Sequence, residues 1–387
     1  MLNYEFTKKY YIDRSQSDSI KWARGRKENC LPMWIADMDF SCDERVIEKL
    51  QQFIDRKDFG YRNLPEDYYQ VFIDWHQKRN DVTYQQEWIR FSKGAVNAMH
   101  QIILSQTKEK DAILVNTPIY PPFVGAIKAT GRKVVESKLI NQEGFFTFDY
   151  KDIEKKIRSR NVKMLMLCSP HNPVGRVWKK GELEELFDLC QKYNVLVCAD
   201  EVHSDIIMPD QKFIPALSLK KYQNNLIAIT AASKTFSLAV FSHSHIIIPN
   251  TKLRKKLISY QQVNSYGSVN VMNALPTYYC LKYGEEWLDS LNNVIYENYN
   301  YFKDHLKEYM EMSSLEGSYL LFLNLGPYNS CDSAAECLKD KCHLLVNPGE
   351  SFGKDYSGWV RINLATSLDN IKTAVDAILK LIKQKAS

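Results

Sequence analysis

The sequence contains 387 residues, of which 45% are hydrophobic and 25% charged, and this composition is typical of globular proteins with a sizeable core. The formal net charge is +5, and the basic residues are interleaved with acidic ones, which argues against nucleic acid as a partner. The nine cysteines form no C-x-x-C pair, the apolar runs are too short to span a bilayer, and residues 1–10 lack the apolar core of a signal peptide. We therefore expect reduced thiols, no membrane contact and a cytoplasmic location.

Short apolar segments alternate with helical patterns between about residues 90 and 250. Their apolar residues are nearly continuous, as expected for parallel strands buried on both faces. Between two of them, over residues 183–190, apolar residues recur at helical spacing. This alternation predicts an α/β fold with a doubly wound, mostly parallel sheet. The expected strands are residues 112–115, 134–137, 164–168, 195–199, 226–230 and 244–248.

The C-terminal third has a different pattern. Residues 319–325 are apolar and strand-like, and a final amphipathic helix carries an apolar stripe over residues 371–382. We expect a large α/β domain at residues 46–285. Residues 1–45 and 286–387 would form a smaller α+β domain, with the active site between the two domains.

The most specific motif, residues 169–175, directly follows the expected strand 164–168. Two prolines and a glycine fix a rigid turn there, and Asn172 can project over the crevice at the strand end, where open α/β sheets bind ligands. The alternative interpretation is a simple strand-to-helix turn.

The next two expected strands are followed by Asp200 and Lys234. An aspartate at a buried strand end suits the protonated ring nitrogen of pyridoxal 5'-phosphate (PLP), although a helix N-cap is the alternative. A lysine beyond a buried strand can react with an aldehyde, although a single loop lysine is usually just solvated. In chain order the three strand ends present Asn172, Asp200 and Lys234, which suit the phenolic oxygen, ring nitrogen and aldehyde of PLP.

The chain resembles fold-type I PLP-dependent enzymes of the aminotransferase class I/II superfamily, and within it the MalY/PatB cystathionine β-lyase (C–S lyase, cystalysin-like) group. The resemblance covers essentially the whole sequence and implies a PLP-dependent transferase-like fold. Residues 36–40 and 169–178 favour the C–S lyases over ordinary aminotransferases. The segments that carry the resemblance are residues 31–40, 59–61, 117–120, 169–178 and 361–363.

The resemblance implies catalytic roles for two residues. Lys234 carries the cofactor as a Schiff base and, once displaced, removes the Cα proton of the substrate, while Asp200 keeps the ring nitrogen protonated. Arg361 corresponds to the arginine that binds the substrate α-carboxylate, a role suited to its bidentate guanidinium. Considered alone, Arg361 could equally form a surface ion pair.

The resemblance also implies a set of cofactor-binding residues. Tyr120 would stack on the ring, although a core tyrosine is the alternative. His203 would hydrogen-bond the cofactor or tune Asp200, although a structural histidine is the alternative. Tyr61 would reach the phosphate from the neighbouring subunit, which predicts a homodimer with shared active sites. The complete set is Gly94, Ala95, Val96, Tyr120, Asn172, Asp200, His203, Ser233, Lys234 and Tyr61.

The implied reaction is β-elimination from L-cystathionine, a related cysteine S-conjugate or cysteine, which yields a thiol, pyruvate and ammonia. An aminotransferase is the alternative, because it uses the same groups. A regulatory partner of a transcription factor with little catalysis is an alternative of another class. We expect no metal, because the cysteines after residue 330 and His343 fit no zinc spacing.

Three positions depart from the pattern of the resembling group. Ser237 and Val240 stand where many relatives have Asn and Gly after the lysine, and Asn97 stands where relatives often have Pro. These changes leave Lys234 in place and bear on the phosphate contacts and the substrate preference.

Overall fold

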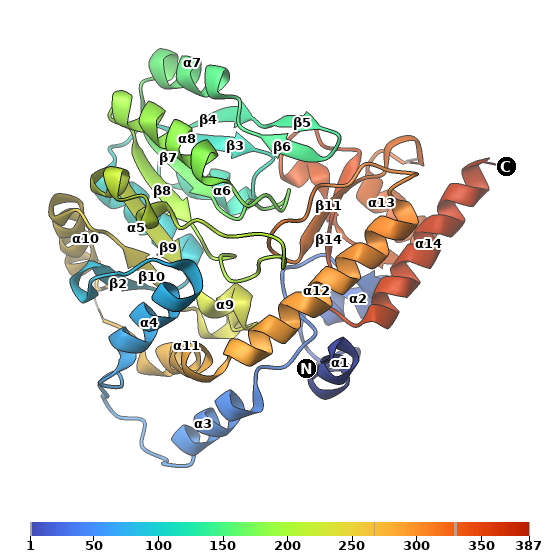
Figure 1. The fold of residues 1–387 in the computed structure, drawn as a ribbon, viewed down its shortest axis with the longest axis horizontal. Coiled ribbons are helices and arrows are strands. Elements are labelled where there is room, and N and C mark those ends of the chain that lie inside the picture. The colour runs from blue at the N-terminus through green and yellow to red at the C-terminus, as the bar shows by residue number, and fades with distance from the viewer. Residues whose placement is uncertain (1, 267, 329–330, 387) are drawn as a thin grey trace.

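A seven-stranded sheet forms the centre of the computed structural model, which describes residues 2–266, 268–328 and 331–386 (Figure 1). Adjacent strands from β9 to β4 are parallel, whereas β10 is antiparallel to both of its neighbours. The predicted doubly wound, mostly parallel sheet is therefore confirmed. In spatial order the strands are β2 (Ile89–Ser92), β10 (Ser244–Ile247), β9 (Leu226–Thr230), β8 (Leu196–Asp200), β7 (Val162–Cys168), β3 (Ala112–Thr117) and β4 (Lys133–Lys138).

Both faces of this sheet are buried, because side chains on one strand point alternately to opposite faces. On β3, Ile113 and Val115 pack in one hydrophobic cluster, while Leu114 packs in another. The first cluster includes residues of α5 (Ala95–Gln106), α6 (Pro121–Ala129) and α10 (Thr251–Val263). The second includes residues of α4 (Tyr68–Asn80), α7 (Tyr150–Arg160) and α8 (Lys180–Lys192). Two-sided burial explains the continuous apolar runs of the sequence.

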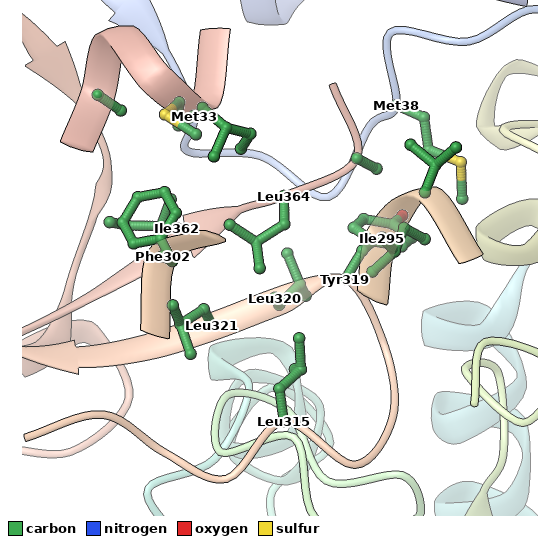
Figure 2. Packing of buried hydrophobic residues seen from close by; sticks show 14 of the residues in the cluster. Met33, Met38, Ile295, Phe302, Leu315, Tyr319, Leu320, Leu321, Ile362 and Leu364 are labelled. Atoms are coloured by element: carbon green, nitrogen blue, oxygen red, sulfur yellow. The ribbon is translucent and has the colours of Figure 1, made fainter. Parts of the chain in front are cut away.

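A three-stranded antiparallel sheet lies beside the large one, to the right in Figure 1. Figure 2 shows Leu320 and Leu321 of this sheet packing with Ile362 on the next strand and with Phe302. Residues from both ends of the chain build this core. The elements that contribute to it include α1 (Asn3–Tyr10), β1 (Leu31–Pro32), α12 (Glu285–Leu306), β11 (Leu320–Asn324), α13 (Ala334–Cys342), β12 (Leu344–Leu345), β14 (Trp359–Asn363) and α14 (Leu368–Ala386). Beside it, β13 (Asn347–Pro348) pairs with β14, and α2 (Ile20–Glu28) packs against β1.

The remaining segments connect these two cores. A short hairpin, β5 (Ile140–Gln142) and β6 (Phe145–Thr147), precedes α7, while α3 (Glu44–Ile54) and α11 (Val271–Tyr283) pack against each other. The domain boundaries at residues 46 and 285 stay a prediction. Within the described parts of the chain, no helix is both long enough and apolar enough to cross a membrane.

Candidate active site

The carboxyl ends of β7, β8 and β9 lie side by side, because these strands are parallel neighbours in the sheet. Asn172 follows β7, Asp200 is the last residue of β8, and Lys234 lies in the short helix α9 (Ala232–Thr235) after β9. A cavity of about 160 Å³ opens at this edge and is lined by all three residues. The complete lining is Ala36, Ala95, Val96, Met99, Tyr120, Phe123, Cys168, Asn172, Asp200, Val202, His203, Ser233 and Lys234.

Lys234 directs its amine into this cavity region, where Nζ donates a hydrogen bond to the carbonyl oxygen of Ala36 at 2.9 Å. Burial, and then the positive charge of Arg361, lower the pKa of Lys234 to about 8. A lysine with this pKa is largely a free amine in mildly alkaline solution, so it can attack an aldehyde and accept a proton.

Asp200 is only 4% exposed, and its Oδ1 accepts a hydrogen bond from the backbone N–H of Val202 at 3.2 Å. Burial raises the pKa of Asp200 to about 7, whereas this hydrogen bond and the charge of Lys234 act in the opposite direction. An ionised Asp200 in this site therefore gains stability from any cation that binds beside it.

Arg361 on β14 enters the site from the smaller sheet and is 2% exposed. Its Nη1 donates to Asn172 Oδ1 at 3.1 Å and its Nη2 donates to the carbonyl oxygen of Trp34 at 3.0 Å. Its buried Nε has no hydrogen-bond partner among the described residues, and burial lowers the pKa of this guanidinium to about 10. A buried cation with an unused donor is suited to a carboxylate ligand. Asn172 and Arg361 are thus in direct contact, although 189 residues separate them.

The N-terminus of α5 forms the wall that Ala95 and Val96 contribute to the cavity. Gly94 caps this helix with φ 87° and ψ 161°, a conformation that is essentially restricted to glycine. No atom lies within 4 Å of where a Cβ on Gly94 would be placed, so the space beside this turn is open. Backbone N–H groups at such a helix start attract anions.

Tyr120, His203 and Ser233 complete the predicted set around the cavity. The buried Nδ1 of His203 has no hydrogen-bond partner within the described residues. Burial, together with the nearby charges of Lys234 and Arg361, lowers the pKa of His203 to about 3, so the imidazole is neutral at pH 7. A neutral histidine can accept or donate one hydrogen bond to a ligand here.

Three predicted site residues, Gly94, Arg361 and Tyr61, are not part of the cavity lining. Gly94 directly precedes Ala95 of the lining and Arg361 bonds Asn172 of the lining, whereas Tyr61 has no such link. Tyr61 lies between α3 and α4 and its side chain is fully exposed. Its predicted contact across a subunit boundary stays a prediction.

Several residues near the site carry no role in the sequence prediction. Cys168, Val202, Met99 and Phe123 line the cavity, and each lies within five residues of a predicted site residue or motif. Tyr319 had no such signal. Its ring packs edge-on against His203, with 6.0 Å between ring centroids, and only the tertiary fold places it there.

Residues 29–378 match the family described as aminotransferase class I and II. The chain belongs to this family. It is 30% identical to cystathionine beta-lyase PatB of Bacillus subtilis over 95% of this chain and 97% of PatB. It is 25% identical to protein MalY of Escherichia coli over 98% of this chain and 99% of MalY. The resemblance predicted from the motifs is therefore confirmed.

Two solved structures are similar to the whole chain. Cystalysin of Treponema denticola, which contains a PLP cofactor, has a TM-score of 0.91 and 31% identity over 96% of this chain and 98% of its own. A PLP-bound C–S lyase of Staphylococcus hominis has a TM-score of 0.89 and 29% identity over 96% of both chains. These scores confirm the predicted PLP-dependent transferase-like fold.

Proposed function

We propose that the protein is a PLP-dependent C–S β-lyase, which cleaves L-cystathionine or a related cysteine S-conjugate to a thiol, pyruvate and ammonia. The observation that supports it most is that Lys234 and Asp200 line one cavity, while Arg361 bonds Asn172 of the same lining. Relatives named cystathionine beta-lyase and PLP-bound C–S lyase structures, similar over nearly the full chain, support the same activity.

The residues of the cavity fit PLP. The N–H groups at the start of α5 suit its phosphate, and the ring nitrogen is a cation that would compensate the charge of buried Asp200. The amine of Lys234 suits its aldehyde, and the unpartnered Nδ1 of His203 offers a further hydrogen bond. When bound, PLP supplies an electron sink for the negative charge that develops at the substrate Cα.

Three residues of this chain then have different roles in the reaction of the substrate. Arg361 binds the α-carboxylate through its guanidinium and thereby fixes the orientation of the Cα–H bond. Lys234, whose lowered pKa increases its fraction of free amine, accepts the Cα proton as general base. An ionised Asp200 would hold the ring nitrogen of bound PLP in its protonated form. The electron pair left at Cα then forms a Cα–Cβ double bond while the Cβ–S pair leaves with the thiolate. Water hydrolyses the remaining unsaturated amine to pyruvate and ammonia.

The protein would act as a homodimer with shared sites. Tyr61 is fully exposed, and Phe59 beside it is 67% exposed while its ring packs against Phe53 of α3. Val240 and Val263 are 85% and 84% exposed. Exposed apolar side chains of this size favour burial against a partner. A second copy of the chain would cover them and bring Tyr61 to its phosphate site. The cytoplasmic location also stays a prediction.

The deciding experiment compares two assays of purified protein. With L-cystathionine we expect pyruvate and homocysteine, and borohydride should fix the cofactor on Lys234. Lys234→Ala should form neither product above background. With an amino acid that lacks a leaving group, plus a keto acid, we expect little amino exchange. Rapid exchange in this second assay, with no pyruvate in the first, would instead identify an aminotransferase, the activity that the family's description also includes.

A further inference from the structure

Asp205 lies outside the cavity lining, yet it belongs to the turn that carries two residues of the site. This turn follows Asp200, the last residue of β8, and contains Val202 and His203. Backbone hydrogen bonds from Ser204 to Glu201 (3.0 Å) and from Ile206 to His203 (3.1 Å) hold it compact. Asp205 is 8% exposed, so its position is fixed relative to Asp200 by short local geometry.

Both carboxylate oxygens of Asp205 accept hydrogen bonds from other elements. Trp75 Nε1 of α4 donates to Oδ1 at 3.0 Å, and Thr235 Oγ1 of α9 donates to Oδ2 at 2.9 Å. Asn292 of α12 also donates, through Nδ2, to the backbone oxygen of Asp205 at 3.1 Å. Hydrogen bonds to an ionised acceptor are stronger than those between neutral groups. Asp205 therefore links four segments at one buried point.

Thr235 is the neighbour of Lys234 in the chain and is fully buried. The helix that holds both, α9, has only four residues, so its own hydrogen bonding is limited to bonds such as that from Phe236 N–H to Ala232 at 2.9 Å. Shortly after it, Ser237 adopts a positive φ of 56°. A helix this short depends on tertiary contacts for its position. The bond to Asp205 is such a contact, and it lies directly beside the reactive lysine.

We propose that Asp205, acting through Thr235, is a positioning residue that fixes the position of the Lys234 amine relative to Asp200. This inference rests on the proposed function of Lys234. Asp205 touches neither substrate nor cofactor. It joins the turn after Asp200 to the turn bearing Lys234, so the separation of these two groups does not depend on the cofactor being present.

The test measures the Lys234 amine directly, by labelling it in cofactor-free protein. Reductive methylation with formaldehyde and cyanoborohydride, followed by peptide mapping, gives the labelling rate of Lys234 at each pH. Thr235→Val keeps the side-chain shape and removes the hydroxyl. We expect the lysine to become more solvated, its labelling midpoint to rise by roughly one pH unit, and labelling at pH 8 to fall about five-fold.

Matched variants separate positioning from general damage. Thr235→Ser keeps the hydroxyl and should retain the wild-type midpoint. Thr277→Val makes the same exchange at a buried threonine of α11 and should also retain it. Asp205→Asn keeps the shape but weakens the charge-assisted bond, so it should shift the midpoint in the same direction as Thr235→Val, by less. If Thr235→Val does not fold, Asp205→Asn carries the test.

An unchanged midpoint in Thr235→Val, or in Asp205→Asn where only that variant folds, would overturn the inference. An equal shift in Thr277→Val would overturn it too, because the effect would then be general. The absorption band of the holoenzyme, titrated with pH, should shift in the same variants. Failure of the proposed function is seen separately: wild-type protein would then take up no PLP or would release no pyruvate, whatever the labelling pattern.

Discussion

Asp200 is buried, and without a bound cofactor its burial disfavours the ionised form of its carboxyl group. Burial raises its pKa to about 7, whereas an aspartate in an unfolded chain has a pKa of about 3.9. The folded, cofactor-free protein therefore prefers the protonated acid. This preference contributes fully to stability below about pH 4 and is lost as the pH rises through about 7.

We expect Asp200→Asn to remove this pH dependence. Near pH 4 the cofactor-free variant and the wild type should be equally stable, and at pH 8 the variant should be more stable, by up to about 4 kcal/mol. It should also bind PLP more weakly, because the ring nitrogen loses its anionic partner. Thermal unfolding from pH 4 to 9 measures the first effect and cofactor titration the second. Parallel stability curves for the two proteins would contradict this account of Asp200.

Arg361→Lys tests the assigned carboxylate contact. The guanidinium already uses Nη1 and Nη2 on Asn172 and Trp34, and a lysine amine cannot reproduce that planar arrangement. We expect kcat/KM for L-cystathionine to fall about 10- to 100-fold, mainly through KM. Arg254→Lys is the control, since Arg254 is also buried but bonds the carbonyl oxygens of Ile248 and Pro249, just before α10. If both variants lose the same activity, Arg361 has no special role with substrate.

The helix α5 contributes to the site through its N-terminus rather than through side chains. Its buried residues hold it against the sheet, and its first N–H groups lie at the cavity. Gly94 sets the entry of the chain into this helix with a positive φ of 87°. Anion binding at this end depends on backbone geometry, so it tolerates variation in side chains such as Asn97.

Gly94→Ala should therefore weaken both stability and cofactor binding. The substituted Cβ meets no neighbour within 4 Å, so the cost arises from the backbone conformation and should be about 1–3 kcal/mol. Gly125→Ala in α6 is the matched control: its Cβ also meets nothing within 4 Å, its φ is not positive, and alanine should stabilise that helix slightly. Thermal unfolding and PLP titration of both variants make the comparison. Similar behaviour of the two would contradict the proposed phosphate site.

The proposed dimer makes a prediction about hybrids of two inactive subunits. A Lys234→Ala subunit lacks the reactive amine, and a Tyr61→Phe subunit lacks the hydroxyl offered to the neighbouring site. Mixed dimers should regain activity, because one of the two sites then has both intact groups. The measurement is pyruvate release after the two variants are mixed and allowed to exchange subunits. A fully active monomer, or hybrids with no gain over either parent, would contradict shared sites.

The sequence alone predicted six of the seven strands of the large sheet and the order of chemical groups along its edge. Strands buried on both faces leave continuous apolar runs, and their ends are marked by proline, glycine and polar residues in the local sequence. All six expected strands coincide with β3, β4, β7, β8, β9 and β10 within two residues at each end. Asn172, Asp200 and Lys234 were therefore predicted to meet, because parallel neighbours end at the same edge.

Other features depend on contacts that no local pattern encodes. The strand β2 (Ile89–Ser92) is short and contains an arginine, so the sequence pattern did not indicate a strand there. The antiparallel direction of β10 follows from its pairing with β2 and β9. The hydrogen bond from Lys234 to the carbonyl oxygen of Ala36 joins residues that are 198 positions apart in the chain. The hydrogen bond from Arg361 to Asn172 joins residues that are 189 positions apart. Only the tertiary structure brought them together, because hydrogen bonding and burial act through space, whereas periodicity records only neighbours along the chain.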